Sequence, residues 1–231
     1  MTEPNQTTNS RNASAPSQPT PAEVWDQVVA SALQKKSSPS TATERFGLMA
    51  LRLATAPTVK HLPATKRTVA SMATEVRQVV RQLVAGEQPW PLVLMGSPGS
   101  GKTCAALCLL DYAGGEYYTV WSLCDLLIQS QQGRLEIESS SQIWKTYPAQ
   151  FWKRMATYPL VVLDELGCRD RASDHHFECV KNLIDARHGK PLVVVSNHQL
   201  DDLARLYDDR IASRLAAGTV AEVDGKDRRL S

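Results

Sequence analysis

Eight consecutive residues constrain the fold of this 231-residue chain most, because they satisfy the pattern G-x-x-x-x-G-K-[ST]. They are Gly96, Ser97, Pro98, Gly99, Ser100, Gly101, Lys102 and Thr103. Glycines in such a loop let successive backbone N–H groups turn inward as a nest for anions. A helix that starts directly after the loop adds the positive end of its dipole. The pattern therefore requires a strand, a loop and a helix in that order.

The neighbouring sequence supplies both flanking elements. The run from Trp90 to Met95 predicts a buried strand, and residues 104–110 predict a helix. We therefore expect the loop to bind a nucleoside triphosphate, with Lys102 at the β- and γ-phosphates and the Thr103 hydroxyl as a ligand of Mg²⁺. A Gly/Ser-rich turn with an accidental lysine is the alternative, and it does not account for the flanking elements.

Length and composition narrow the class of protein. The chain has room for one α/β domain but not for two large ones. Its formal charge of +2 is nearly balanced, so total charge does not argue for nucleic acid. No apolar run reaches membrane-spanning length, and the first residues lack the order of a secretory signal. We expect a cytoplasmic protein with no membrane partner.

The cysteines predict neither disulfides nor a metal site. Their number, 5, is odd, and no two of them form a C-x-x-C pair. Cys104 and Cys108 share a helix face, but no third ligand has suitable spacing. We therefore expect reduced thiols that pack in the core, and no zinc.

Three regions follow one another along the chain. Residues 1–63 form a largely disordered region that contains a short amphipathic helix over 22–36. This helix either packs on the main domain or docks a partner. Residues 64–225 form the nucleotide-binding domain, and residues 226–231 form a basic C-terminal tail.

Helical and strand patterns alternate through the central domain. Helices are predicted over 64–85, 104–110, 123–131, 141–157, 172–187 and 208–215, and strands over 90–95, 116–120, 160–164, 191–196 and 219–223. Alternation of this kind predicts an α/β fold, with a parallel sheet and helices on both of its faces.

Two acids end one of the predicted strands. The apolar run 160–163 leads directly into Asp164 and Glu165. In a parallel sheet this places both carboxylates at the carboxyl-terminal edge, where ligands bind. Asp164 suits Mg²⁺, and Glu165 suits polarisation of the attacking water.

The next apolar strand also ends in a polar side chain. Asn197 follows residues 192–196 and can orient the water or contact the γ-phosphate. An ordinary turn asparagine is the alternative reading of this position.

Two arginines occupy one face of the last predicted helix. Arg210 and Arg214 are spaced i and i+4, with Ile211 and Leu215 on the packing side. One guanidinium presented to a neighbour's nucleotide would stabilise charge on the transferring phosphoryl group. A solvated face of paired Asp and Arg side chains is the alternative.

In this order and spacing, GSPGSGKT, LVVLDELG, LVVVSN and DDRIASRL resemble the AAA+ P-loop ATPases of the initiator clade, and within them the helicase loaders and transposition helpers of the DnaC and IstB type. The resemblance covers residues 64–225. It implies ATP binding by residues 96–103, Mg²⁺ and water handling by Asp164 and Glu165, and sensing by Asn197. It also implies an inter-subunit arginine finger at Arg214, with Arg210 at a second interface position.

The family also implies an architecture. Only 17 residues follow Arg214, so we expect the helical lid of many AAA+ proteins to be absent and the nucleotide to be enclosed by a neighbouring subunit of a homo-oligomer. The predicted helices 123–131 and 141–157 resemble the helical insertion of the initiator clade.

The resemblance implies an ATPase that acts as an assembly factor in DNA replication and loads a replicative helicase onto single-stranded DNA. Its turnover is expected to be slow and stimulated by DNA or the partner. One alternative is an IstB-like transposition helper that acts with a transposase on single- or double-stranded DNA. Another is a nucleotide-switched adaptor with negligible turnover.

Aromatic and basic side chains interleave in one segment, as stacking on single strands requires. They are Trp144, Lys145, Tyr147, Phe151, Trp152, Lys153 and Arg154. Packing of these aromatics in the core is the alternative to DNA contact.

Overall fold

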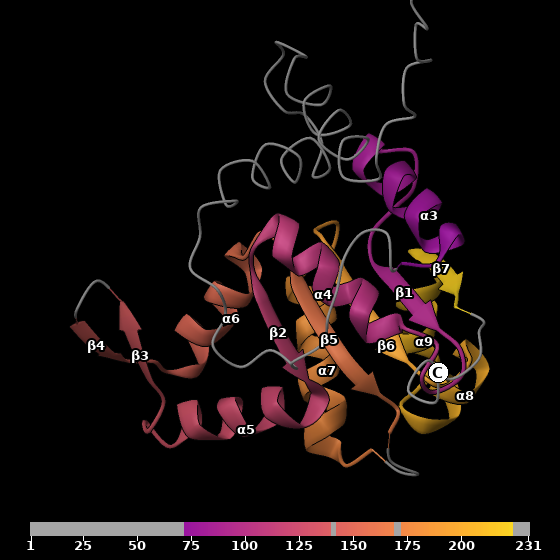
Figure 1. Ribbon diagram of the computed structural model, residues 1–231. Helices are drawn as coiled ribbons and strands as arrows, with labels where there is room; N and C mark the ends of the chain where they lie inside the picture. The colour runs from indigo at the N-terminus through magenta and orange to yellow at the C-terminus, as the bar shows by residue number, and fades with distance from the viewer. Residues whose placement is uncertain (1–71, 140–141, 169–171, 224–231) are drawn as a thin grey trace, which may run out of the picture.

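The computed structural model describes residues 72–139, 142–168 and 172–223 (Figure 1). Its helices are α3 (Thr74–Ala85), α4 (Lys102–Ala113), α5 (Val120–Gln131), α6 (Pro148–Thr157), α7 (Asp174–Ala186), α8 (Leu200–Leu206) and α9 (Asp209–Ala216). Its strands are β1 (Leu92–Met95), β2 (Glu116–Thr119), β3 (Glu136–Ser139), β4 (Gln142–Lys145), β5 (Val161–Leu166), β6 (Leu192–Ser196) and β7 (Thr219–Glu222). The expected helix 22–36 and the basic tail 226–231 lie outside the described residues.

A five-stranded parallel sheet forms the centre of the domain, in the order β2-β5-β6-β1-β7. Its middle strands β1 and β6 consist of apolar residues apart from Ser196, and both are buried along their whole length, as strands covered on two faces must be. The order places β6 between the strand that precedes the phosphate loop and the strand that ends in the two acids. The predicted α/β fold is confirmed.

Helices cover both faces of the sheet, and alternate residues of each strand face opposite layers. Leu94 and Val162 pack with α3 and α4 in one buried cluster. Val93 and Leu163 pack with α5, α6, α7, α8 and α9 in the other. Figure 1 shows α4 in front of the sheet and α7 behind β5.

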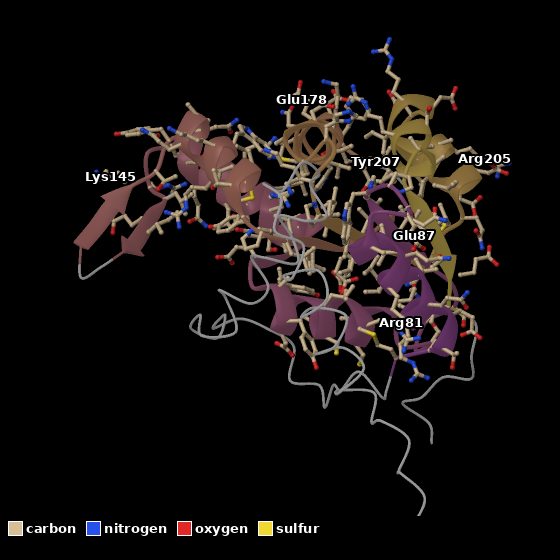
Figure 2. All side chains as sticks on the ribbon, turned by 90° about the horizontal axis from the view of Figure 1, so that it is seen from above. Arg81, Glu87, Lys145, Glu178, Arg205 and Tyr207 are labelled. Carbon is tan, nitrogen blue, oxygen red and sulfur yellow. The ribbon has the colours of Figure 1, made fainter. Side chains whose placement is uncertain are left out.

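The insertion between β2 and β5 differs from the prediction of two helices. Residues Gln142–Lys145 pair antiparallel with Glu136–Ser139, so the predicted helix 141–157 is wrong in its first part. The helix begins only at Pro148, because proline has no N–H to donate and its ring clashes with a preceding helical turn. The hairpin that carries Lys145 projects from the body, on the opposite side from Arg205 in α8 (Figures 1 and 2).

Two other elements differ from the prediction. The helix predicted over 64–85 does not run continuously, because Met72 and Ala73 are not helical and α3 begins at Thr74. Helix α8 was not predicted, because its seven residues bury only Leu203 completely and give too little periodic signal.

A buried arginine joins the segments that precede β5 and β6. The side chain of Arg187, at the end of α7, is 2% exposed. Its guanidinium donates hydrogen bonds to the backbone carbonyls of Met155, Tyr158, Pro159 and Pro191. Burial lowers the pKa of Arg187 to about 10, which leaves the group charged at neutral pH. This cation therefore replaces water as the partner of four carbonyls at the amino-terminal edge of the sheet.

Candidate functional site

The phosphate loop connects β1 to α4 and depends on glycine geometry. Gly96, Gly99 and Gly101 have φ values of 137°, 77° and 101°, where side chains are strained. A Cβ on Gly96 would lie 2.4 Å from the carbonyl oxygen of Val223, because the residue after β7 passes beside the loop. Gly101 is the N-cap of α4, and because glycine has no side chain, no side-chain oxygen caps the first backbone N–H groups of the helix. A helix that starts in this way is suited to bind phosphate.

Lys102 folds back over this loop. Its ammonium donates to the carbonyl oxygens of Gly96 and Ser97, both at 2.7 Å, and to Ser100 Oγ at 3.4 Å. The side chain is 5% exposed, so its charge is directed into the loop and not into bulk solvent. The cation therefore lies where the oxygens of a bound phosphate would be its partners.

Thr103 and Asp164 meet although they are 61 residues apart. The Thr103 hydroxyl donates to Asp164 Oδ2 at 2.9 Å, and the Tyr117 hydroxyl donates to the same oxygen at 2.9 Å. A hydroxyl and a carboxylate are the hard oxygen ligands that Mg²⁺ prefers. The donor set at the loop therefore fits Mg²⁺.

The contribution of Tyr117 was not predicted from the sequence. β2 pairs with β5 so that Thr119 lies opposite Asp164, which brings Tyr117 to the same edge. Burial, and then the charge of Asp164, raises the pKa of Tyr117 above its ordinary value. Tyr117 thus stays a protonated donor at neutral pH. Its signal in the sequence is weak, since a tyrosine in a half-buried strand is common.

Glu165 occupies an unusual backbone conformation. Its φ is 61°, in the left-handed region that non-glycine residues rarely adopt. β5 advances from Leu163 to Leu166 while β6 advances only from Val194 to Ser196, so β5 carries an extra residue at a bulge. The N–H of Glu165 donates to Asp164 Oδ1 at 2.7 Å, which holds the turn.

The bulge separates the two acids. Asp164 is 4% exposed, whereas Glu165 is exposed to solvent. Left-handed conformations of this kind cost about 1–3 kcal/mol and persist where the surrounding structure requires them. One carboxylate is therefore fixed beside Thr103 and the other is available to a reactant.

Asn197 lies at the same edge of the sheet. It directly follows β6, between β5 and β1, and its side chain is exposed. The end of β6 is tied to β5, because Ser196 Oγ donates to the carbonyl of Leu166 at 2.8 Å. The parallel sheet thus brings the phosphate loop, Asp164, Glu165 and Asn197 to one edge.

The two arginines of α9 lie on its exposed face. The helix packs through Ile211 and Leu215, which are 1% and 0% exposed, and it presents Arg210 and Arg214 to solvent. Arg214 forms an ion pair with Asp185 of α7. Asp185 lies near the end of α7, and α9 leads into the start of β7, so Arg214 lies toward the amino-terminal edge of the sheet, whereas Asp164 lies toward its carboxyl-terminal edge.

The aromatic and basic segment divides between core and surface. Phe151 is 2% exposed and packs in the core, with the ring of Trp152 edge-on at 5.2 Å between centroids. Tyr147 is 50% exposed, and Lys153 is exposed. Core packing thus explains Phe151, while Tyr147 and Lys153 lie on the surface, as a contact with nucleic acid requires.

Comparisons with known proteins show the fold. No family model matches the chain, and no curated protein matches it in sequence. The structure of DnaA from Aquifex aeolicus bound to AMPPCP matches at 16% identity and a TM-score of 0.55, over 73% of this chain and 54% of that one. DnaA bound to AMPPCP and single-stranded DNA matches at 17% identity and a TM-score of 0.53, over 65% of this chain and 46% of that one.

A weaker likeness, with a TM-score of 0.48 and 18% identity, is to the DnaC helicase loader, over 86% of this chain and 99% of that one. The matches to DnaA show that the chain has an α/β P-loop NTPase fold, and the chain spans about half the length of those DnaA chains. In the three stretches that the structure describes, no helix is long and apolar enough to cross a membrane.

Proposed function

We propose that this chain is an AAA+ ATPase that acts as an assembly factor in DNA replication and loads a replicative helicase onto single-stranded DNA. The observation that carries the proposal is the 2.9 Å hydrogen bond between Thr103 and Asp164, which joins the phosphate loop to the acid strand. A structural turn has no need of such a contact, whereas a magnesium nucleotide needs both groups at one place.

Each residue of this edge has a role in the proposal. Residues 96–103 bind the phosphates of ATP, while Thr103 and Asp164 hold Mg²⁺. Bound Mg²⁺ supplies positive charge next to the phosphate oxygens. Glu165 accepts a proton from the attacking water, and Asn197 orients that water. The exposed position of Glu165 at the bulge supports this division of labour between the two acids.

The arginines act between subunits in this proposal. Because Arg214 lies toward the amino-terminal edge of the sheet, away from its own Asp164, it reaches a nucleotide in a neighbouring copy of the chain. Arg210, one helical turn earlier and exposed, contacts the same neighbour. The functional form is therefore a homo-oligomer with ATP at each junction.

The proposed partners are a replicative helicase and single-stranded DNA. DnaA, which has the same fold, has been solved with AMPPCP and single-stranded DNA together, and this supports a nucleic-acid partner. Exposed Tyr147 and Lys153 supply the stacking and phosphate contacts that single strands require.

Glu165→Gln tests the chemistry, because it keeps the shape of the side chain and removes only its charge. The variant is expected to bind ATP with wild-type affinity and to hydrolyse it about 10²–10⁴-fold more slowly. Lys102→Ala is expected to lose tight ATP binding, measured with a fluorescent ATP analogue. Glu87→Gln, an exposed glutamate after α3 (Figure 2), is the matched control and should leave both unchanged.

The result also separates the alternatives. Negligible turnover of wild type, measured with single-stranded DNA present, would identify a nucleotide-switched adaptor and not an ATPase. Appreciable turnover that is equal in wild type and Glu165→Gln would mean that Glu165 is not the catalytic carboxylate. Pulldown against the replicative helicase and the transposase of the same genome distinguishes a loader from a transposition helper. Capture of the transposase alone would overturn the loader assignment.

A further inference from the structure

Three potential metal ligands converge between α5 and α7, away from the phosphate loop. They are Cys124 of α5 and His175 and Cys179 of α7, and their ligand atoms all lie within 4.8 Å of one another. His175 and Cys179 are spaced i and i+4, so they share one face of α7. Cys124 is 3% exposed and Cys179 is 0% exposed, while His175 is partly exposed.

The contacts within this cluster match a metal site. Cys179 Sγ lies 3.7 Å from His175 Nε2, and the sulfur of Cys124 lies within 4.8 Å of both atoms. In a tetrahedral zinc site, bonds of about 2.3 Å to sulfur and 2.1 Å to nitrogen separate the two ligand atoms by about 3.6 Å. The three side chains therefore need little movement to share one ion.

We propose that Cys124, His175 and Cys179 bind a zinc ion that bridges α5 and α7. Two thiolates and a neutral imidazole offset the double positive charge of the ion, so the buried site carries no net charge. Among the residues that the structure describes, no further His, Cys, Asp or Glu joins the cluster, and the fourth tetrahedral position is left to water. Partial exposure of His175 provides the access that this water requires.

The location gives the ion a structural role beside the active edge. Helix α5 starts directly after β2, and α7 starts after the segment that follows Glu165. A small cavity next to the cluster is lined by Glu165, Trp121, His176 and Tyr207. His176 follows the ligand His175 directly, Trp121 lies three residues before the ligand Cys124, and the two ring centroids are 5.9 Å apart. Zinc therefore fixes the two helix starts that flank Glu165.

Cobalt titration of the reduced, full-length protein tests the site, because Co²⁺ occupies tetrahedral zinc sites and absorbs visible light in them. We expect one equivalent of Co²⁺ with thiolate-to-cobalt charge transfer, displaced by Zn²⁺. His175→Ala and Cys179→Ala should lose this signal. The His175→Ala variant should also remain folded, because it removes only a partly exposed side chain. Cys108→Ala and Cys104→Ala remove a buried and a partly exposed thiol of α4 and should keep it.

Other outcomes overturn the proposal. These are no stoichiometric tetrahedral signal in wild type, an unchanged signal in folded His175→Ala, or equal loss in the two control variants. A disulfide between Cys124 and Cys179 that forms in place of metal binding also overturns it. Lys102→Ala should bind Co²⁺ normally, so failure of the ATPase proposal and failure of the zinc proposal are distinguished.

Discussion

Two regions of the molecule hold arginine in opposite ways. At the amino-terminal edge of the sheet, next to the segments that lead into β5 and β6, Arg187 is 2% exposed and donates to four backbone carbonyls. On the outer face of α9, the side chain of Arg214 is 42% exposed, and its partner is the carboxylate of Asp185, itself 40% exposed. The same guanidinium is thus enclosed by the chain in one place and presented to solvent in the other.

The difference separates a structural cation from an exchangeable one. Removing Arg187 would leave buried carbonyls without donors, which costs about 1–3 kcal/mol for each group left unsatisfied. An exposed pair such as Arg214–Asp185 contributes about 0–1 kcal/mol, so another partner can replace Asp185 at little cost. Burial and number of partners, more than charge, therefore indicate which arginine is available to a neighbouring subunit.

The largest expected effect is the loss of ATPase activity in the Arg214→Ala variant. Loss of an arginine finger lowers the rate by about 10³-fold or more, while ATP binding and the melting temperature stay near wild type. ATPase assays under conditions where wild type assembles, with DNA or partner present, measure the rate. Arg205→Ala removes another exposed arginine of an ion pair and should leave the rate unchanged.

Mixing the variants shows whether Arg214 acts between subunits. A Lys102→Ala subunit cannot bind ATP tightly but still carries Arg214, and an Arg214→Ala subunit still carries an intact phosphate loop. Where the two kinds of subunit meet, the loop of one can therefore face the arginine of the other. Activity should partly return in the mixture. Assembled mixtures with no ATPase above the sum of the separate variants would return Arg210 and Arg214 to a solvated helix face.

Arg187→Met has the next largest effect, and it acts on stability. We expect the free energy of unfolding to fall by about 3–5 kcal/mol, because four carbonyls lose a buried cation while the methionine keeps the aliphatic stem. Urea denaturation measures this change, and the folded fraction should bind ATP normally. The exposed control Arg205→Met should stay within about 0.5 kcal/mol. Equal losses in the two variants would remove the distinction between the buried and the exposed arginine.

Asp185→Asn has the smallest expected effect. It releases Arg214 and Lys181 from the carboxylate that they share, and because both pairs are exposed we expect the free energy of unfolding to change by about 1 kcal/mol or less. The ATPase rate of assembled protein should stay equal or rise, by about fivefold at most, since that is the factor for 1 kcal/mol. A rate more than tenfold lower would instead mean that Asp185 positions Arg214 for its neighbour.

Sequence patterns predict the central sheet and its helices better than the segment inserted between β2 and β5. The buried strands and the helix after the loop are confirmed, because each carries its own apolar period or run. The hairpin that contains Lys145 is missed, since strands so short give little periodic signal and the helical pattern of α6 was extended across Pro148. Tyr117 and Arg187 are missed for another reason: their roles depend on groups distant in sequence.

Patterns among adjacent residues are enough to predict the phosphate loop, the acids after an apolar run and the amphipathic α9. The packing of the folded chain is what brings Thr103 to Asp164 across 61 residues, and Cys124 to His175, 51 residues further along. Short-range spacing predicts no zinc site for the same reason. Strand order, register and helix packing result from burying the whole core, and no local pattern of residues encodes them.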